Sequence, residues 1–194
     1  MPVDIDYEVP TWSQIFDLLY YQAQKIQNQS YKPDVVIGIA RGGLISARIL
    51  TDLLETPELG ILQIEFYSDI NKTHPKPTIK QPLNHSFTGK KTLIVDDIAD
   101  SGESLKLAQA HLQELGANEI KTATLFKKPF SAITPDFYEK QTINWVVFPW
   151  ETKETLRKTI QKNQGKRALN REVAKLVKAG LPKQLAERLL KDMY

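Results

Sequence analysis

The sequence contains no cysteine and only three histidines, His74, His85 and His111. Without cysteine the chain can form no disulfide bond and offers no thiolate for catalysis or metal binding. The histidines are scattered and do not show the close spacing that is typical of zinc ligands. We therefore expect neither a zinc-dependent mechanism nor a catalytic triad.

Long apolar segments are also missing. No apolar run approaches the roughly 18 residues that are needed to span a bilayer. The first residues, MPVDIDYEVP, lack the basic start and apolar centre of a secretory signal peptide. We therefore expect a cytoplasmic protein with no membrane partner. With 194 residues, of which 41% are hydrophobic and 25% charged, the chain can bury a sizeable core.

The net charge of +3 is distributed unevenly along the chain. Residues 152–194 contain 12 Lys/Arg and 4 Asp/Glu, a net charge of +8, whereas residues 1–151 contain 14 and 19, a net charge of −5. This change predicts a domain of residues 1–151 and a basic C-terminal extension of residues 152–194. Apolar residues at helical spacing predict three short helices in the extension, at about 152–163, 170–179 and 182–193.

Strand-like and helix-like patterns alternate in the first 151 residues. A helix is predicted from about Trp12 to Asn28, with Thr11 as its N-cap. Five strands are predicted, at residues 34–40, 61–67, 91–97, 120–126 and 143–149. Helical patterns follow the first and third of these strands. The alternation predicts an α/β fold with a doubly wound, mainly parallel five-stranded sheet, in which ligands bind at the carboxyl ends of the strands.

The segment between Tyr67 and Lys90 has no regular pattern and contains three prolines. A long segment of this kind inside a compact domain is usually a functional lid or a disordered excursion. We expect a lid that contains a short β-hairpin.

Two adjacent carboxylates end the third predicted strand, in the stretch LIVDDIADSGESL from Leu93 to Leu105. After Asp96 and Asp97 a small polar turn opens a helix, whose N-terminus offers free N–H groups and a positive dipole end to a phosphate. The carboxylates can accept hydrogen bonds from ribose hydroxyls, directly or through Mg²⁺. The stretch therefore predicts a ribose 5-phosphate site, although taken alone it also fits a buried strand followed by a serine-capped helix.

The same stretch resembles the phosphoribosyl-pyrophosphate (PRPP) signature of type I phosphoribosyltransferases. Three further segments fit this family in the same order. They are Ala40–Gly43, similar to the pyrophosphate loop, Lys127–Pro129, similar to the lysine segment that contacts the nucleobase, and Trp145–Glu151, similar to the base-stacking segment. The resemblance covers about residues 7–151 and points to the purine branch, especially the compact archaeal enzymes. It implies the type I phosphoribosyltransferase fold, with residues 67–90 as its hood.

The resemblance implies a role for each matched residue. PRPP would be bound by Asp96, Asp97, Ala99, Asp100, Ser101, Gly102, Glu103 and Ser104, and its pyrophosphate by Arg41, Gly42 and Gly43. The base would be bound by Lys128, Trp145, Val146, Phe148 and Glu151. Asp96 and Asp97 would hold Mg²⁺, directly or through water. The implied catalytic residues are Asp100, which handles the purine N7 proton, and Arg41, which neutralises the leaving group. A cis peptide is implied at Ala40–Arg41.

The implied activity is transfer of the 5-phosphoribosyl group of PRPP to a purine base, with Mg²⁺ as cofactor, to give a nucleoside monophosphate and pyrophosphate. A homodimer or tetramer is also implied. The alternative is a PRPP-sensing, non-enzymatic regulator that uses the basic extension on nucleic acid. Arg41, Asp100 and the base-stacking segment argue against it because a sensor need not retain them, so nucleic acid is not an expected partner. A phospho-acceptor receiver domain is discounted because its carboxylates should follow the first strand.

Two questions stay open at this point. Lys128 suits the O6 acceptor of hypoxanthine, guanine or xanthine, whereas the helical extension resembles that of crenarchaeal adenine phosphoribosyltransferases, so the base is undecided. Glu103 stands where many family members have glycine. Its carboxylate could point to solvent from the first helical turn, or it could face the loop and repel a phosphate.

Overall fold

The computed structural model describes residues 6–67, 76–162 and 165–193, which form two compact units. The larger unit is Phe16–Thr142, and the smaller one combines the described N-terminal residues up to Ile15 with Ile143–Tyr194. The units follow packing, whereas the boundary after residue 151 comes from charge composition and stays a prediction. Within the described residues, no helix is both long and apolar enough to cross a membrane.

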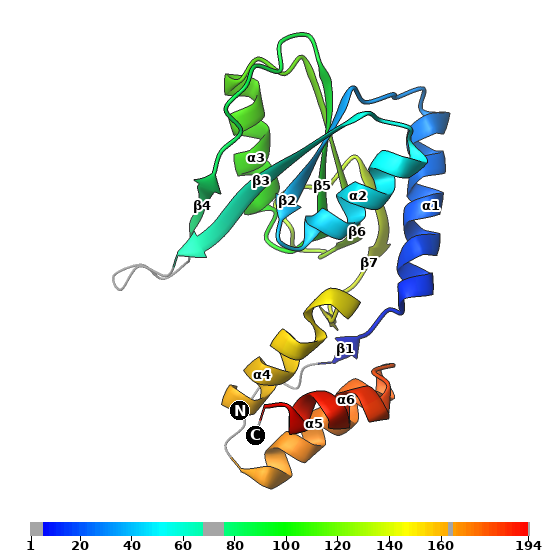
Figure 1. Cartoon of the computed structure of the whole chain (residues 1–194), viewed down its shortest axis with the longest axis vertical. Helices are drawn as coiled ribbons and strands as arrows, with labels where there is room; N and C mark the ends of the chain where they lie inside the picture. Colours follow the sequence, from blue (N-terminus) through cyan, green and yellow to red (C-terminus); the bar gives the residue numbers. More distant parts are fainter. Residues whose placement is uncertain (1–5, 68–75, 163–164, 194) are drawn as a thin grey trace. The chain divides into compact units, whose positions relative to one another are not determined.

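A six-stranded sheet forms the centre of the larger unit (Figure 1). Its strands are β2 (Val35–Ala40), β3 (Glu58–Tyr67), β4 (Lys76–Gln81), β5 (Lys91–Ala99), β6 (Glu119–Lys127) and β7 (Phe137–Gln141), in the order β4-β3-β2-β5-β6-β7. Only β3 and β4 pair antiparallel. The doubly wound, mainly parallel sheet is thereby confirmed, although it has six strands where five were predicted.

The strands differ from the prediction at two places, β7 and the predicted strand 143–149, and each difference has a physical reason. The sequence FYEKQ of β7 has no apolar run because β7 is an edge strand, in which Phe137 is buried while the following side chains are half-buried or exposed. The predicted strand 143–149 shrinks to β8 (Trp145–Val146), which pairs with β1 (Tyr7–Glu8) in a separate two-stranded sheet. Val147 lies in the core of the smaller unit, so this apolar run serves a different core.

The expected hairpin in the hood is represented by β4, which pairs antiparallel with β3 from Gln63 to Tyr67. The part of the predicted hood at residues 68–75 lies outside the described residues.

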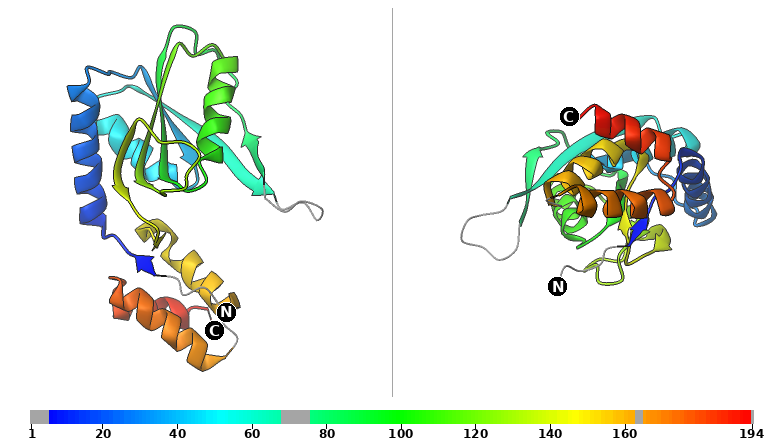
Figure 2. Two further views of the ribbon diagram at one scale, coloured as in Figure 1. Left: turned by 180° about the vertical axis from the view of Figure 1, so that it is seen from behind. Right: turned by 90° about the horizontal axis from the view of Figure 1, so that it is seen from below.

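Helices cover both faces of the large sheet. The helices α1 (Trp12–Asn28) and α2 (Gly43–Leu53) lie on one face and α3 (Glu103–Glu114) on the other (Figures 1 and 2). The predicted cap of α1 is confirmed, because the Gln14 N–H donates to Thr11 Oγ1 at 3.2 Å and the Thr11 N–H donates to Gln14 Oε1 at 2.8 Å. Alternate residues of β2 serve the two faces: Ile37 joins the core under α3, whereas Gly38 admits Ala47 of α2.

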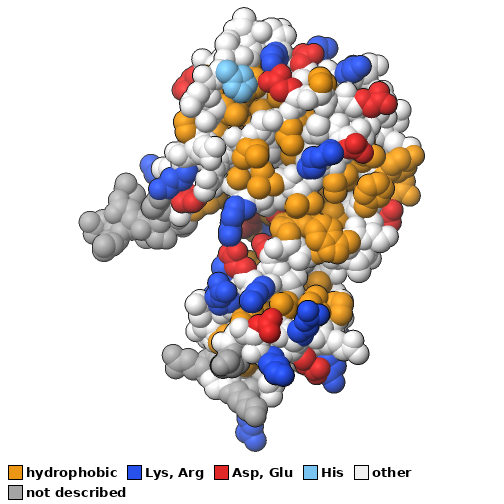
Figure 3. Space-filling view, in the orientation of Figure 1, with side chains coloured by type: hydrophobic (Ala, Val, Ile, Leu, Met, Phe, Trp, Pro, Cys, Tyr) orange, Lys and Arg blue, Asp and Glu red, His pale blue; other side chains and the backbone are white. Residues whose placement is uncertain are grey.

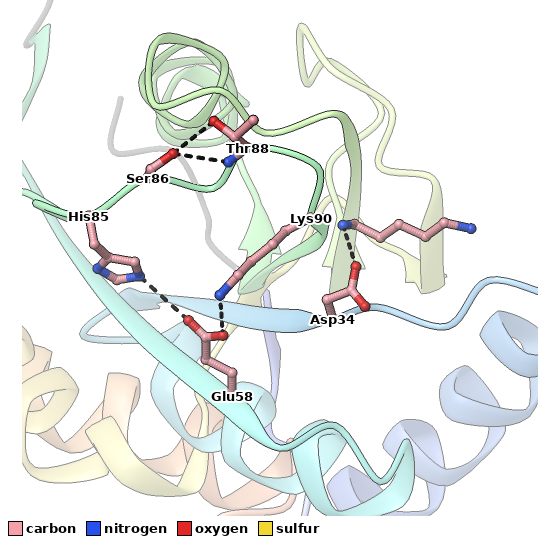
Figure 4. Close-up of polar contacts among 7 residues, drawn as sticks. Asp34, Glu58, His85, Ser86, Thr88 and Lys90 are labelled. Carbon is pink, nitrogen blue, oxygen red and sulfur yellow. Dashed lines mark hydrogen bonds and ion pairs between the residues drawn. The ribbon is translucent and has the colours of Figure 1, made fainter.

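Polar contacts connect neighbouring segments at the end of the sheet where its parallel strands begin (Figure 4). Glu58, at the start of β3, pairs with Lys90 and with His85, whose Nε2 lies 3.5 Å from Glu58 Oε1. Asp34 Oδ2 accepts a hydrogen bond of 2.7 Å from the Lys91 N–H. These contacts hold the chain between β4 and β5 against the sheet.

The smaller unit contains the three predicted helices of the extension. They are α4 (Thr152–Lys162), α5 (Lys166–Lys178) and α6 (Lys183–Lys191). Their apolar faces meet in one core with Val147, formed by Leu156, Leu176, Leu181 and Ala186 and flanked by Tyr7 and Val9. Several Lys and Arg side chains of the extension are therefore left on its surface (Figure 3).

Candidate active site

The predicted site residues gather where the connections of the sheet change direction. From β2 the chain runs through α2 to β3 on one side, whereas from β5 it runs through α3 to β6 on the other. The pairing of β2 with β5 ends at Gly38 and Val95, so the last residues of β5 have no β2 neighbour. Such a switch point leaves a crevice at the carboxyl ends of the strands, which is where open α/β sheets bind ligands.

The turn after β2 packs tightly against β5 at this switch point. A Cβ atom on Gly42 would overlap the carboxylate of Asp97, and one on Gly43 would overlap the carbonyl oxygen of Val95. The Ala40–Arg41 peptide is cis, as the resemblance implied. Only glycine permits this approach, which brings the predicted pyrophosphate loop next to the aspartate pair.

The aspartate pair lies within β5, because the strand continues to Ala99. The Asp97 N–H donates to Asp96 Oδ1 at 2.9 Å, and the Asp97 side chain is buried. Burial raises the pKa of Asp96 well above its ordinary value, and the negative charge of Asp97 adds to this shift. Hydrogen bonds from the backbone of Asp97 and Gly43 oppose it in part. Two carboxylates this close, one buried and one half-buried, favour a ligand that brings positive charge or hydroxyl donors.

A cavity of about 620 Å³ lies over the predicted PRPP loop. It is lined by Phe66 and by every residue from Asp96 to Leu105, so all eight predicted PRPP-binding residues face one cavity. Gly102 ends the loop with a φ of +82°, and a Cβ atom there would lie 2.8 Å from Ser131 Oγ. The N-cap residue Gly102 has no side chain to cap α3, and the one N–H that a side chain reaches is that of Glu103, which donates to Ser101 Oγ at a long 3.4 Å. Most N–H groups of this helix start are therefore available to an anion.

The side chain of Glu103 is held by an ion pair within α3. Its Oε1 accepts a hydrogen bond of 2.8 Å from Lys106 Nζ, one turn further along α3. The carboxylate at this position of the loop is therefore paired with a positive charge.

The predicted lysine segment lies directly behind the PRPP loop. The Lys128 N–H donates to the Ala99 carbonyl at 2.9 Å, and the Ala132 N–H donates to the Ser101 carbonyl at 2.9 Å. Lys127 and Lys128 are both buried, although lysine is usually exposed. The lysine segment and the loop thus form one connected piece of the larger unit.

The predicted base-stacking segment belongs to the smaller unit. Trp145 is exposed, whereas Val146 and Phe148 are buried. The Phe148 ring stacks on Trp150, with ring centres 4.8 Å apart and planes at 8°. Glu151 Oε1 accepts a hydrogen bond of 3.4 Å from the Phe148 N–H. Trp145 is therefore the predicted aromatic residue with the most accessible ring.

Comparison with known proteins gives the family. The phosphoribosyl transferase domain matches residues 11–155. The chain belongs to the phosphoribosyltransferase family. A xanthine-guanine phosphoribosyltransferase of Gluconobacter oxydans is 27% identical over 153 residues, which are 78% of this chain and 88% of the relative. A hypoxanthine-guanine phosphoribosyltransferase of Saccharomyces cerevisiae is 28% identical and covers 60% of this chain, with 59% of its own length matched.

Solved structures agree with this assignment. A purine phosphoribosyltransferase from Pyrococcus horikoshii superposes with a TM-score of 0.70 at 38% identity, covering 75% of this chain and 95% of that one. The resemblance to purine phosphoribosyltransferases is thereby confirmed, together with the type I fold.

The donor groups of this phosphoribosyltransferase suit a hard cation that is shared with the substrate. Within the described part of the chain, no group of three or more His, Cys, Asp or Glu could hold a metal ion by itself. The pair Asp96 and Asp97 offers carboxylate oxygens, and Mg²⁺ commonly binds to one or two carboxylates plus substrate phosphates. The chemistry of the two carboxylates therefore fits Mg²⁺.

Three residues that line the cavity were missed by the sequence reasoning. They are Phe66, Ile98 and Leu105. Phe66 is the next-to-last residue of β3, so its place at the carboxyl end of a strand was the signal that could have identified it.

Proposed function

We propose that this phosphoribosyltransferase acts in purine salvage, transferring the 5-phosphoribosyl group of PRPP to a purine base with release of pyrophosphate. The observation that carries the proposal is the cavity that all eight predicted PRPP-binding residues line, beside the Gly42–Gly43 turn. Relatives that are named as purine, xanthine-guanine and hypoxanthine-guanine phosphoribosyltransferases support it. Nothing in the comparisons favours the non-enzymatic regulator.

In this proposal each part of PRPP has its own place. The 5′-phosphate binds to the loop from Asp100 to Ser104 and to the N-terminus of α3, where N–H groups and the helix dipole favour an anion. The ribose hydroxyls donate to Asp96 and Asp97. The pyrophosphate lies against Arg41 and the backbone of the glycine turn.

Catalysis then requires stabilisation of charge at two places. As the bond from C1′ to pyrophosphate breaks, negative charge grows on the leaving group and the Arg41 guanidinium stabilises it. The purine nitrogen attacks C1′, and Asp100 accepts the proton that the base must lose. When bound with PRPP, Mg²⁺ would supply further positive charge to the pyrophosphate, held by Asp96 and Asp97 directly or through water.

The proposed base is a 6-oxopurine. Lys128 is a hydrogen-bond donor that matches the O6 acceptor, and relatives named for xanthine, guanine and hypoxanthine support this choice. Adenine is the second candidate, because α4, α5 and α6 form the three-helix extension that resembles that of crenarchaeal adenine phosphoribosyltransferases.

A single assay tests the proposal. The purified protein is given PRPP and Mg²⁺ with adenine, hypoxanthine, guanine or xanthine in turn, and nucleotide formation is followed. We expect product with at least one 6-oxopurine and its loss when EDTA removes Mg²⁺. Product with adenine alone would transfer the assignment to the second candidate, and no product with any base would refute the enzyme. The homodimer or tetramer and the cytoplasmic location stay predictions.

A further inference from the structure

An ion pair joins the first turn of α3 to the second, and the proposed chemistry does not use it. Glu103 lines the PRPP cavity, and its carboxylate pairs at 2.8 Å with Lys106, which is not among the cavity-lining residues. The two side chains are 45% and 46% exposed. The pair therefore stands at the rim of the cavity, where solvent screens it only in part.

The stability of α3 explains the presence of Glu103 and does not explain that of Lys106. A carboxylate in the first turn of a helix is favoured by the dipole, whereas a lysine one turn further on gains nothing from it. An exposed pair three residues apart adds only a few tenths of a kcal/mol to helix stability. Glu103 thus suits the helix, and Lys106 needs another reason.

The cavity supplies that reason. Glu103 is one of the loop residues that line this cavity, so a phosphate bound in the loop is exposed to the negative charge of its side chain. Like charges this near repel each other unless a cation lies nearby. Lys106 places a positive charge on that carboxylate. Building on the proposed function, we propose that Lys106 is a positioning residue for PRPP: it neutralises Glu103 so that the loop can accept the 5′-phosphate.

The pair also limits how tightly the loop holds a phosphate. PRPP and the product nucleotide carry the same 5′-phosphate, so the charge balance between Glu103 and Lys106 acts on substrate binding and on product release alike. Loss of Lys106 weakens the binding of both ligands, and loss of the Glu103 charge strengthens it. Without the Glu103 charge Lys106 has nothing to neutralise, so the double variant should bind both ligands about as tightly as Glu103→Gln alone.

Three variants test this inference: Lys106→Met, Glu103→Gln and the double variant. Calorimetric titration with Mg²⁺ and PRPP, without base, gives Kd, and steady-state assays give KM and kcat. We expect Lys106→Met to raise Kd and KM for PRPP about three- to tenfold, with kcat within about twofold of the parent value. Glu103→Gln should lower Kd, and in its background Lys106→Met should change Kd by less than about twofold. The effect of Lys106→Met should shrink in about 1 M salt.

A matched control exists in the same unit. Lys91 and Glu119 form an ion pair of 3.5 Å whose side chains are 48% and 43% exposed, at the start of β5 and thus at the other end of that strand. Lys91→Met should leave the Kd for PRPP unchanged. It removes the same charge and a pair of the same exposure, so it reports any effect of net charge or fold stability alone.

Distinct outcomes separate the possible failures. If Lys106→Met binds PRPP with the Kd of the parent protein, the inference is overturned. It is also overturned if Lys106→Met weakens PRPP binding as much in the Glu103→Gln background as in the parent, since Lys106 would then act without Glu103. An equal effect of Lys91→Met assigns the change to net charge and also overturns it. A parent protein that binds no PRPP refutes the proposed function itself, and the inference with it.

Discussion

The ionised carboxylate of Asp96, which the proposed site uses to bind its ligand, lowers the stability of the folded chain. Burial and the charge of Asp97 raise its pKa, so the ionised form is less favourable in the folded than in the unfolded chain. This destabilisation is present above the folded pKa and disappears as pH falls through it toward the unfolded value of about 4. We expect Asp96→Asn, which keeps the acceptor for the Asp97 N–H, to raise the melting temperature of metal-free protein at neutral pH. Thermal unfolding across a pH series measures the gain, which should shrink in acid.

The control for this prediction is Asp52→Asn. Asp52 lies on the exposed surface of α2, with its Oδ1 3.9 Å from Arg48, and its loss should change stability by less than about 0.5 kcal/mol. An Asp96→Asn protein that melts below the parent at neutral pH would contradict the argument.

Asp100 should show the opposite behaviour, a loss of rate without a loss of stability. It is exposed and lines the cavity, and the proposed mechanism uses its carboxylate to accept a proton from the base. We expect Asp100→Asn to lower kcat about 100-fold, with a small change in the KM for PRPP, because the backbone of the loop still binds the phosphate. Ser104→Ala, assayed beside it, should change KM more than kcat. Parent-like turnover in Asp100→Asn would remove the residue from the general-base role.

At the scale of elements, Tyr31 fastens the connection after α1 to the central strand β5. Its buried hydroxyl donates to the Thr92 carbonyl at 2.9 Å. Burial, reinforced by the charge of Glu119, raises the pKa of Tyr31 above its usual value near 10. The hydroxyl therefore contributes stability below about pH 10 that is lost at higher pH, where only the unfolded tyrosine ionises.

Tyr31→Phe tests this attachment. The variant should lose about 1 kcal/mol of unfolding free energy at pH 7, and the difference from the parent should narrow above about pH 10. Urea unfolding at both pH values measures it. Tyr20→Phe, on the exposed face of α1, is the control and should match the parent. A constant difference at both pH values would exclude ionisation of Tyr31 as the cause.

Elements whose residues are close in sequence could be predicted, and those that depend on distant partners could not. The loop from Asp96 to Ser104 was predicted because strand, turn and helix start are local patterns, and all its residues do line one cavity. The partner of β8 could not be predicted, because Trp145 pairs with Tyr7 across most of the chain. The pairing of Glu103 with Lys106 was also undecided, since helical spacing allows it without requiring it.

At the scale of the whole molecule, the two ends of the chain build one unit. Tyr7 and Val9 lie against the same core as Val147 and the three C-terminal helices. The charge boundary after residue 151 therefore marks a change of surface and does not mark a separate core. Composition could reveal the basic surface, whereas the shared core depends on contacts between residues more than 100 positions apart.

Substitution of Leu176 tests whether this shared core is a cooperative unit. Leu176 is 0% exposed and Leu185 is 39% exposed, and both are leucines of the extension. Leu176→Ala should lose about 3 kcal/mol from the smaller unit, and Leu185→Ala less than about 1 kcal/mol. Hydrogen exchange should then quicken in β1, β8 and the three C-terminal helices together, while β2 and β5 keep their protection. Faster exchange confined to α4, α5 and α6 would show that the extension has its own core after all, as the charge boundary suggests.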